Sequence, residues 1–287
     1  MKILVTGASG QLGYDVCREL KKRNVEHRGV NSRDFDLSDP EATYTYVSHY
    51  APDAVIHCAA YTAVDEAEDN RELCRKINVG GTEAIAKYCA NRDAKLVYIS
   101  TDYVFPGTGE KAYEIGDPIG AVNVYGTTKL GGEQAVRRLA AHHFIVRISW
   151  VFGIHGKNFV RTMLSLGKKE HALRITGDQF GSPTYTADLA PLLCDMIETE
   201  KYGTYHATNE GICTWAEFAA EIFRQASMEV QVTPRAAAER PSKAQRPCNS
   251  RMSKASLDKA GFCRLPVWQD ALGRYLEELK QEASQER

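Results

Sequence analysis

A tyrosine and a lysine stand four residues apart in the segment YGTTK, at Tyr125 and Lys129. On a helix this spacing places both side chains on one face. A tyrosine hydroxyl can donate a proton, but its ordinary pKa of about 10 is high for that task. A nearby ammonium and an oxidised nicotinamide favour the phenolate and lower this pKa, so the pair is typical of a proton donor in carbonyl reduction. An ordinary pair on a helix surface has the same spacing, and the residues upstream decide between the two readings.

A second hydroxyl comes from Thr101, at the end of the apolar segment AKLVYIST. A hydride that reaches a ketone carbon leaves charge on the ketone oxygen, which Tyr125 would protonate and Thr101 would orient. Lys129 can also hold the ribose of a nicotinamide. We therefore predict Thr101, Tyr125 and Lys129 as the catalytic residues.

The segment TGASGQLG places three glycines directly after the first apolar segment, KILV, and at the start of a helical stretch. Gly7 permits a tight turn, Gly10 lets the backbone approach a pyrophosphate, and Gly13 lets the helix pack close to the sheet. The helix N-terminus adds free N–H groups and the positive end of its dipole. This position predicts a dinucleotide site, and the alternative is a glycine-rich turn without a ligand.

The end of the second strand bears on the choice of coenzyme. An acid there often binds the adenosine ribose, but GVNSRDFD offers Asn31, Ser32 and Arg33. An arginine can meet a 2′-phosphate, so NADPH is favoured over NADH, although Arg33 can equally be a solvated loop charge. Asp36 and Leu37 come later and are expected to flank the adenine.

Strand and helix patterns alternate through the first half of the chain. DAVIHCAA and AKLVYIST are continuous apolar runs, typical of strands buried on both faces, and helices are expected over 40–50 and about 70–91. HFIVRISWVFG is expected to be a further strand. This alternation predicts an α/β fold, a Rossmann-like doubly wound parallel sheet with a smaller α/β C-terminal substrate lobe. The carboxyl ends of its strands would bring the candidate residues together.

The pattern loosens after Gly153, which suggests two domains. We expect residues 1–150 to form the dinucleotide-binding domain, with 186–208 returning to it, and 151–185 with 209–287 to form the substrate-binding lobe. In TWAEFAAEIF, Thr214 and Glu217 form a capping-box pattern before an amphipathic helix.

Bulk properties exclude several classes of protein. A net charge of −1 over 287 residues provides no basic field for nucleic acid or an anionic membrane, and no apolar run reaches the roughly 18 residues that cross a bilayer. The start MKILVTGASG does not read as a signal peptide, and the eight cysteines show no CxxC or zinc spacing. We expect a cytoplasmic protein with reduced thiols, a monomer or homodimer, without bound metal.

In their order along the chain, TGxxGxxG, INVGGT with Asn78, STDYVF and YxxxK resemble the extended short-chain dehydrogenase/reductase superfamily. Within it, STDYVFPGTG, DQFGSPT and the late RPCNS resemble the dTDP-4-dehydrorhamnose reductase family, and similar blocks cover nearly the whole chain. The resemblance implies NAD(P)H-dependent reduction of the C4 ketone of dTDP-4-dehydro-β-L-rhamnose to dTDP-β-L-rhamnose, in nucleotide-sugar and cell-surface polysaccharide biosynthesis.

The resemblance also implies roles for single residues. The implied coenzyme contacts are Gly10, Gln11 and Leu12 at the diphosphate, Asp36 and Leu37 at the adenosine, and Ala60, Tyr61, Thr62 and Ile99 near the nicotinamide. The implied substrate contacts are Thr101, Asp102, Trp150, Arg246 and Asn249. Structural roles are the alternatives, with Trp150 as a core aromatic, Asp102 as a turn cap and Asn78 at a helix kink. We interpret His57 as a core histidine.

Two rival functions share these motifs. Nucleotide-sugar dehydratases use a Thr-Asp-Glu run, whereas Tyr103 follows Thr101 and Asp102 here, which argues against dehydration and leaves an epimerase as an alternative. The regulatory β-subunit of methionine adenosyltransferase is similar to this reductase family and acts through partner binding. The complete set of three predicted catalytic residues favours an enzyme.

Overall fold

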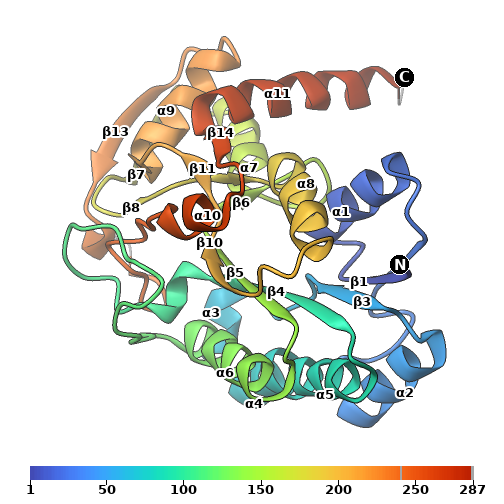
Figure 1. The fold of residues 1–287 in the computed structure, drawn as a ribbon. Coiled ribbons are helices and arrows are strands. Elements are labelled where there is room, and N and C mark those ends of the chain that lie inside the picture. The colour runs from blue at the N-terminus through green and yellow to red at the C-terminus, as the bar shows by residue number, and fades with distance from the viewer. Residues whose placement is uncertain (240, 286–287) are drawn as a thin grey trace.

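The computed structural model describes residues 1–239 and 241–285, and its largest sheet has six parallel strands in the order β10-β5-β4-β3-β1-β2 (Figure 1). These strands are β1 (Ile3–Thr6), β2 (His27–Val30), β3 (Ala54–His57), β4 (Lys95–Thr101), β5 (His143–Ile148) and β10 (Gly203–His206). The strand order reverses between β1 and β3, as in a doubly wound sheet, and confirms the predicted α/β fold class.

Helices cover both faces of this sheet (Figure 1). One face carries α1 (Gln11–Lys22) and α8 (Thr186–Ile197); the other carries α2 (Pro40–Tyr50), α5 (Thr82–Arg92) and α6 (Val124–Leu139). Side chains alternate between the two cores along β1, where Ile3 and Val5 pack with α1 and α8 while Leu4 packs on the opposite face. Two-sided burial explains why these strands read as unbroken apolar runs.

The predicted helix over about 70–91 is divided in the structure. It consists of α4 (Arg71–Arg75), a π-helical segment (Lys76–Gly81) and α5, preceded by the short α3 (Val64–Ala67). Asn78 lies in the π-helical segment, a distortion that is frequent at functional sites.

The predicted strand HFIVRISWVFG is wrong as one element. β5 ends at Ile148, and a second strand, β6 (Val151–Phe152), pairs with β9 (Thr184–Tyr185) outside the main sheet. Between them Trp150 has a φ of 50°, a left-handed conformation that turns the chain away from the sheet. Further on, β10 pairs with β5, so the chain comes back to the main sheet after α8.

Most of the remaining elements pack around a separate apolar core that includes Phe152, Phe218 and Tyr275, whereas Leu257 and Leu265 join the core of the main sheet. They are α7 (Phe159–Gly167), β7 (Ala172–Thr176), β8 (Phe180–Gly181), β11 (Asn209–Glu210), β12 (Cys213–Thr214), α9 (Trp215–Gln225), β13 (Gln231–Arg235), α10 (Ala255–Ala260), β14 (Leu265–Val267) and α11 (Trp268–Gln285). The capping box predicted at Thr214 and Glu217 is confirmed, because each side chain meets the other residue's backbone N–H.

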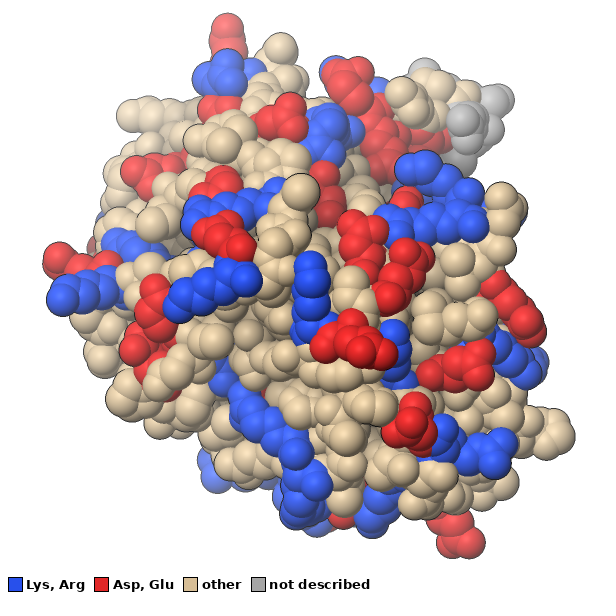
Figure 2. Space-filling model, in the orientation of Figure 1, with Lys and Arg blue, Asp and Glu red and all other residues tan. Residues whose placement is uncertain are grey.

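The surface carries both signs of charge. Figure 2 shows Lys and Arg interspersed with Asp and Glu on the face drawn, in keeping with the formal net charge of −1. Within the described residues, no helix is both long and apolar enough to span a bilayer.

Candidate active site

A cavity of about 750 Å³ opens at the carboxyl ends of the central strands and is bordered on its far side by α7 and α9. Fifteen of the predicted site residues line it: Gly7, Gly10, Gln11, Leu12, Asn31, Asp36, Leu37, Ala60, Thr62, Ile99, Thr101, Asp102, Tyr125, Lys129 and Trp150. Four do not line it, namely Arg33, Tyr61, Arg246 and Asn249. The topology therefore brings together residues that lie more than a hundred positions apart in the chain.

The glycine loop forms the cavity wall at the start of α1. Gly7 has a φ of 70°, and a Cβ atom at Gly13 would lie 2.2 Å from the carbonyl oxygen of Gly7, so only glycine allows this close packing. Gly10 caps α1 without any side-chain hydrogen bond, which leaves N–H groups of the first turn available. These residues fit a dinucleotide, because the free N–H groups suit a pyrophosphate.

The loop after β2 contributes Asn31 but not Arg33 to the cavity. The Asn31 Oδ1 accepts a hydrogen bond of 2.9 Å from the backbone N–H of Arg33, and Asp34 accepts one of 2.8 Å from the N–H of Asn31. This turn leaves the Arg33 side chain exposed and outside the cavity lining. Phe35, which the sequence analysis did not select, lines the cavity instead.

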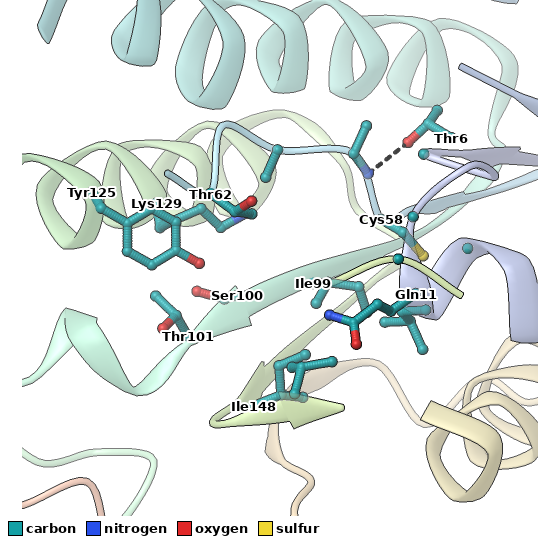
Figure 3. Close-up of a pocket in the computed structure, with 18 of the residues that line it drawn as sticks. Thr6, Gln11, Cys58, Thr62, Ile99, Ser100, Thr101, Tyr125, Lys129 and Ile148 are labelled. Atoms are coloured by element: carbon teal, nitrogen blue, oxygen red, sulfur yellow. Dashed lines mark hydrogen bonds between the residues drawn. The ribbon is translucent and has the colours of Figure 1, made fainter. Parts of the chain in front are cut away.

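The catalytic candidates on α6 are placed by the start of that helix. The Asn123 side chain caps it by accepting a 2.7 Å hydrogen bond from the N–H of Gly126, so Tyr125 lies in the first turn and Lys129 one turn later. Figure 3 shows the Tyr125 ring extending from α6 toward Ser100 and Thr101 at the end of β4, with the Lys129 side chain directed toward Thr62. Tyr125 and Lys129 thus lie one turn apart on α6 and line the same cavity as Thr101.

Burial dominates the acid–base properties of this cluster. It raises the pKa of Tyr125, as does the nearby Asp102 carboxylate, while a hydrogen bond with Thr101 acts in the opposite direction. Burial also lowers the pKa of Lys129 to about 7, although Glu133 partly offsets this effect. In the protein without coenzyme the pKa of Tyr125 is therefore raised rather than lowered, because desolvation outweighs the charge of Lys129; the predicted lowering by the ammonium and an oxidised nicotinamide together stays a prediction.

Lys129 lies over an aromatic ring and in the field of a buried carboxylate. Its Nζ lies 4.1 Å from the ring centroid of the buried Tyr98, within the range of a cation–π contact. Glu133, one helical turn further on, is fully buried and accepts hydrogen bonds of 2.6 Å from Ser100 Oγ and 2.8 Å from Arg147 Nε. Glu133 was not predicted as a site residue, yet its position four residues after Lys129 indicates that it lies on the same face of α6.

Asn78 connects the loop after β3 to α6. Its Oδ1 accepts a 2.8 Å hydrogen bond from the N–H of Tyr61, and its Nδ2 donates to Thr128 Oγ1 at 3.1 Å. Tyr61 serves here through its backbone, whereas its neighbours Ala60 and Thr62 line the cavity. His57 is buried between the hydroxyls of Thr6 and Thr82, at 2.7 and 3.1 Å, as expected of a core histidine.

Asp102 lies in the cavity wall and also fixes the turn after β4. It accepts a 2.9 Å hydrogen bond from Thr101 Oγ1 and a second hydrogen bond from Ser250 Oγ. Burial raises the pKa of Asp102 to about 6. The carboxylate thus joins the strand end to the C-terminal segment that contains RPCNS.

Arg246 and Asn249, predicted as substrate contacts, do not line this cavity. Arg246 forms a two-point ion pair with Asp65, at 3.0 and 2.7 Å. Asn249 is buried, and its Nδ2 donates to the carbonyl oxygens of Thr108 and Lys111. Both residues anchor the C-terminal segment, and from RPCNS it is Ser250 that reaches the cavity wall, through Asp102.

Aromatic side chains close the far side of the cavity. Trp150 stacks on Trp215 with ring centroids 3.7 Å apart and an interplanar angle of 13°. Phe159 of α7 and Phe218 of α9 complete this wall. Phe159, Trp215 and Phe218 were not predicted as site residues, although the i, i+3 spacing of Trp215 and Phe218 in TWAEFAAEIF places them on one helix face.

Metal ligands do not gather in the part of the chain that the structure describes, where no three His, Cys, Asp or Glu side chains form a group able to hold an ion. The groups available for chemistry are a buried hydroxyl, a phenol, an ammonium and a carboxylate beside the glycine loop, Gly7 to Gly13, which we call the dinucleotide cradle.

A doubly wound sheet with a glycine loop and a threonine–tyrosine–lysine cluster defines a dinucleotide-dependent oxidoreductase of the Rossmann type. The chain belongs to the family described as RmlD substrate binding domain, which matches residues 1–281. This match agrees with the resemblance to the dTDP-4-dehydrorhamnose reductase family found in the sequence motifs.

Individual proteins of known name are similar to this chain over nearly its whole length. The chain is 38% identical to the spore coat polysaccharide biosynthesis protein SpsK of Bacillus subtilis (strain 168), over 96% of this chain and 97% of that protein. It is 37% identical to the dTDP-4-dehydrorhamnose reductase of Escherichia coli (strain K12), over 97% and 98%. The solved dTDP-4-dehydrorhamnose reductase of Bacillus anthracis str. Ames, in complex with NADP, is 41% identical with a TM-score of 0.93, covering 97% of this chain and 100% of that one.

Proposed function

We propose that this protein reduces the C4 ketone of dTDP-4-dehydro-β-L-rhamnose to dTDP-β-L-rhamnose with NADPH as the reductant. The observation that carries the proposal is one cavity with the glycine loop at one end and Thr101, Tyr125 and Lys129 at the other. Reductase relatives of nearly equal length and the NADP in the Bacillus anthracis structure support it. The product would supply a sugar for cell-surface polysaccharide.

The cradle residues would hold the coenzyme along the cavity. Gly10, Gln11 and Leu12 would bind its diphosphate at the N-terminus of α1, and Asp36 would lie beside the adenosine. Ala60, Thr62 and Ile99 would border its nicotinamide end. When bound, the reduced nicotinamide supplies the hydride.

The chain itself would supply the proton. Because burial raises the pKa of Tyr125, its phenol stays protonated in the free site and can donate to the ketone oxygen as charge develops there. In its protonated form, Lys129 over the Tyr98 ring would stabilise the phenolate that remains, and the phenolate would in turn favour that protonated form. In the free site the Thr101 hydroxyl donates its one proton to Asp102, and it would position the ketone oxygen by donating that proton to the substrate instead.

The position of the aromatic wall supports separate coenzyme-binding and substrate-binding segments of the chain. Residues 1–150 with 186–208 would bind the coenzyme, and 151–185 with 209–287, which carry Phe159, Trp215 and Phe218, would bind the nucleotide sugar. We propose a cytoplasmic enzyme that acts as a monomer or homodimer.

The test is whether the protein oxidises NADPH in the presence of dTDP-4-dehydrorhamnose, measured as the loss of the absorbance of the reduced nicotinamide. Tyr125→Phe should lower turnover by about 2 to 4 orders of magnitude, the range for a positioned acid–base group, with unchanged NADPH affinity. Tyr44→Phe, on α2 and remote from the cavity, is the matched control and should behave as wild type. Lack of oxidation by wild type, or a product isomeric with the substrate, would refute the reductase and favour an epimerase.

A further inference from the structure

The indole of Trp150 is enclosed on both faces. One face stacks on Trp215 at 3.7 Å between ring centroids. A Cβ atom at Gly181 would lie 2.8 to 3.0 Å from Cε2, Cζ2 and Nε1 of Trp150. Two rings stacked this closely leave no space for such an atom between them, so Gly181 covers the opposite face.

Gly181 and Trp215 form the two walls of a slot around the Trp150 indole, and one small sheet positions both of them. Gly181 of β8 pairs with Cys213 of β12, and Trp215 begins α9 two residues later. The capping box between Thr214 and Glu217 fixes that start, with backbone-to-side-chain hydrogen bonds of 2.7 and 3.1 Å. The distance between the two walls is therefore set by paired backbone rather than by flexible side chains.

The backbone of Trp150 also favours a fixed indole. A φ of 50° is a costly conformation for a bulky residue and persists where surrounding contacts determine it. The carbonyl oxygen of Trp150 accepts a 3.2 Å hydrogen bond from the N–H of Thr184. With both faces covered, the edge of the indole is the part left to border the cavity, and none of the hydrogen bonds formed within residues 1–239 and 241–285 is donated by its Nε1–H.

We propose that Gly181 and Trp215 are positioning residues that hold the Trp150 indole edge-on, so that its Nε1–H, rather than a ring face, meets an oxygen of the nucleotide sugar. This inference rests on the proposed function and adds a specificity determinant to it. An indole N–H is a donor only, so the clamp selects for an acceptor oxygen at this point of the substrate. Trp215 acts through Trp150 and needs no contact of its own with the substrate.

A double-mutant cycle tests this coupling. Trp150→Phe removes the N–H, and Trp215→Leu removes one wall; each should raise KM for the nucleotide sugar roughly 5- to 10-fold, the equivalent of one lost hydrogen bond. The double variant should be no worse than either single variant, because both remove the same interaction. Trp215→Phe keeps an aromatic wall and should restore KM, and KM for NADPH should not change in any of them.

A spectroscopic readout reports the clamp independently of turnover. Stacked indoles give an exciton couplet in circular dichroism, which should be present in wild type and in the control Trp268→Phe and absent from Trp150→Phe and Trp215→Leu. Gly181→Ala disturbs the slot from the other face and should also raise the sugar KM, so the test does not depend on Trp215→Leu folding well.

The failures of the two proposals are distinguishable. An active wild type whose KM stays unchanged in both Trp215→Leu and Gly181→Ala would overturn the clamp alone, as would additive effects of Trp150→Phe and Trp215→Leu. A folded wild type with the couplet but without NADPH oxidation would overturn the proposed function and, with it, the substrate role of Trp150.

Discussion

Replacement of Lys129 by methionine should make the free protein more stable while it abolishes efficient turnover. The side chain is 3% exposed, and its charged form is penalised by burial. Methionine is apolar, flexible and of similar length, so it can fill the same space without a charge. The expected gain in stability arises from removal of a buried ammonium, and the loss of activity from removal of the group beside Tyr125.

The lowered pKa determines the magnitude. Burial reduces the pKa of Lys129 from 10.5 to about 7. At about 1.4 kcal/mol per pKa unit, this costs the folded wild type about 5 kcal/mol below pH 7. Because the unfolded chain binds more protons between pH 7 and 10.5, the cost decreases as the pH rises through that window. Loss of the contact with the Tyr98 ring offsets about 1 to 2 kcal/mol of the gain.

The assay is urea unfolding without coenzyme at about pH 6.5 and about pH 9.5, where linkage predicts different results. Lys129→Met should exceed wild type by about 3 kcal/mol at the lower pH and by less than about 1 kcal/mol at the higher pH. Lys168→Met, at an exposed lysine, is the control and should show no such pH dependence. A Lys129→Met protein that is less stable at both pH values, or whose difference does not change with pH, would refute the desolvation argument.

Two further predictions concern the cradle and the turn after β4. Gly13→Ala should raise the Kd for NADPH at least tenfold in a fluorescence titration, because its Cβ would lie 2.2 Å from the Gly7 carbonyl oxygen. Gly116→Ala is the control and should leave the Kd unchanged, because a Cβ atom there would have no neighbour within 4 Å. An unchanged Kd for Gly13→Ala would contradict the assignment of the glycine loop to the coenzyme. The pH profile of kcat/KM should fall below about pH 6 as Asp102 gains a proton and loses an acceptor site for Thr101 or Ser250. Asp102→Asn should be slower and lack this acidic limb, whereas an unchanged limb would exclude Asp102 as its origin.

Local spacing was sufficient to predict the parts of the site that depend on a single element. The Tyr125–Lys129 pair and the glycine loop follow from helical periodicity and from the sterics of one strand–helix turn. Thr101 could be added because parallel strands end at a common edge of the sheet. These residues line the cavity in the structure.

Residues whose positions depend on contacts between distant segments could not be predicted in the same way. Arg246 pairs with Asp65, 181 positions away, and Ser250 reaches Asp102 across 148 positions. No local pattern distinguishes an arginine that anchors a segment from one that binds a phosphate. The break of a strand at Trp150 was equally hidden, because apolar residues continue on both sides of it.

The cavity concentrates features that cost free energy, and each is held by several contacts. Lys129 is a buried ammonium over an aromatic ring, Asp102 is a buried carboxylate between two hydroxyls, and Trp150 is a bulky residue at positive φ between two walls. A site relaxed at any of these positions would be more stable but less able to impose one geometry on its substrate. Lys129→Met should therefore move stability and turnover in opposite directions, whereas Gly13→Ala should lower both stability and coenzyme binding, because Gly13 allows close packing and carries no strain that its replacement could release.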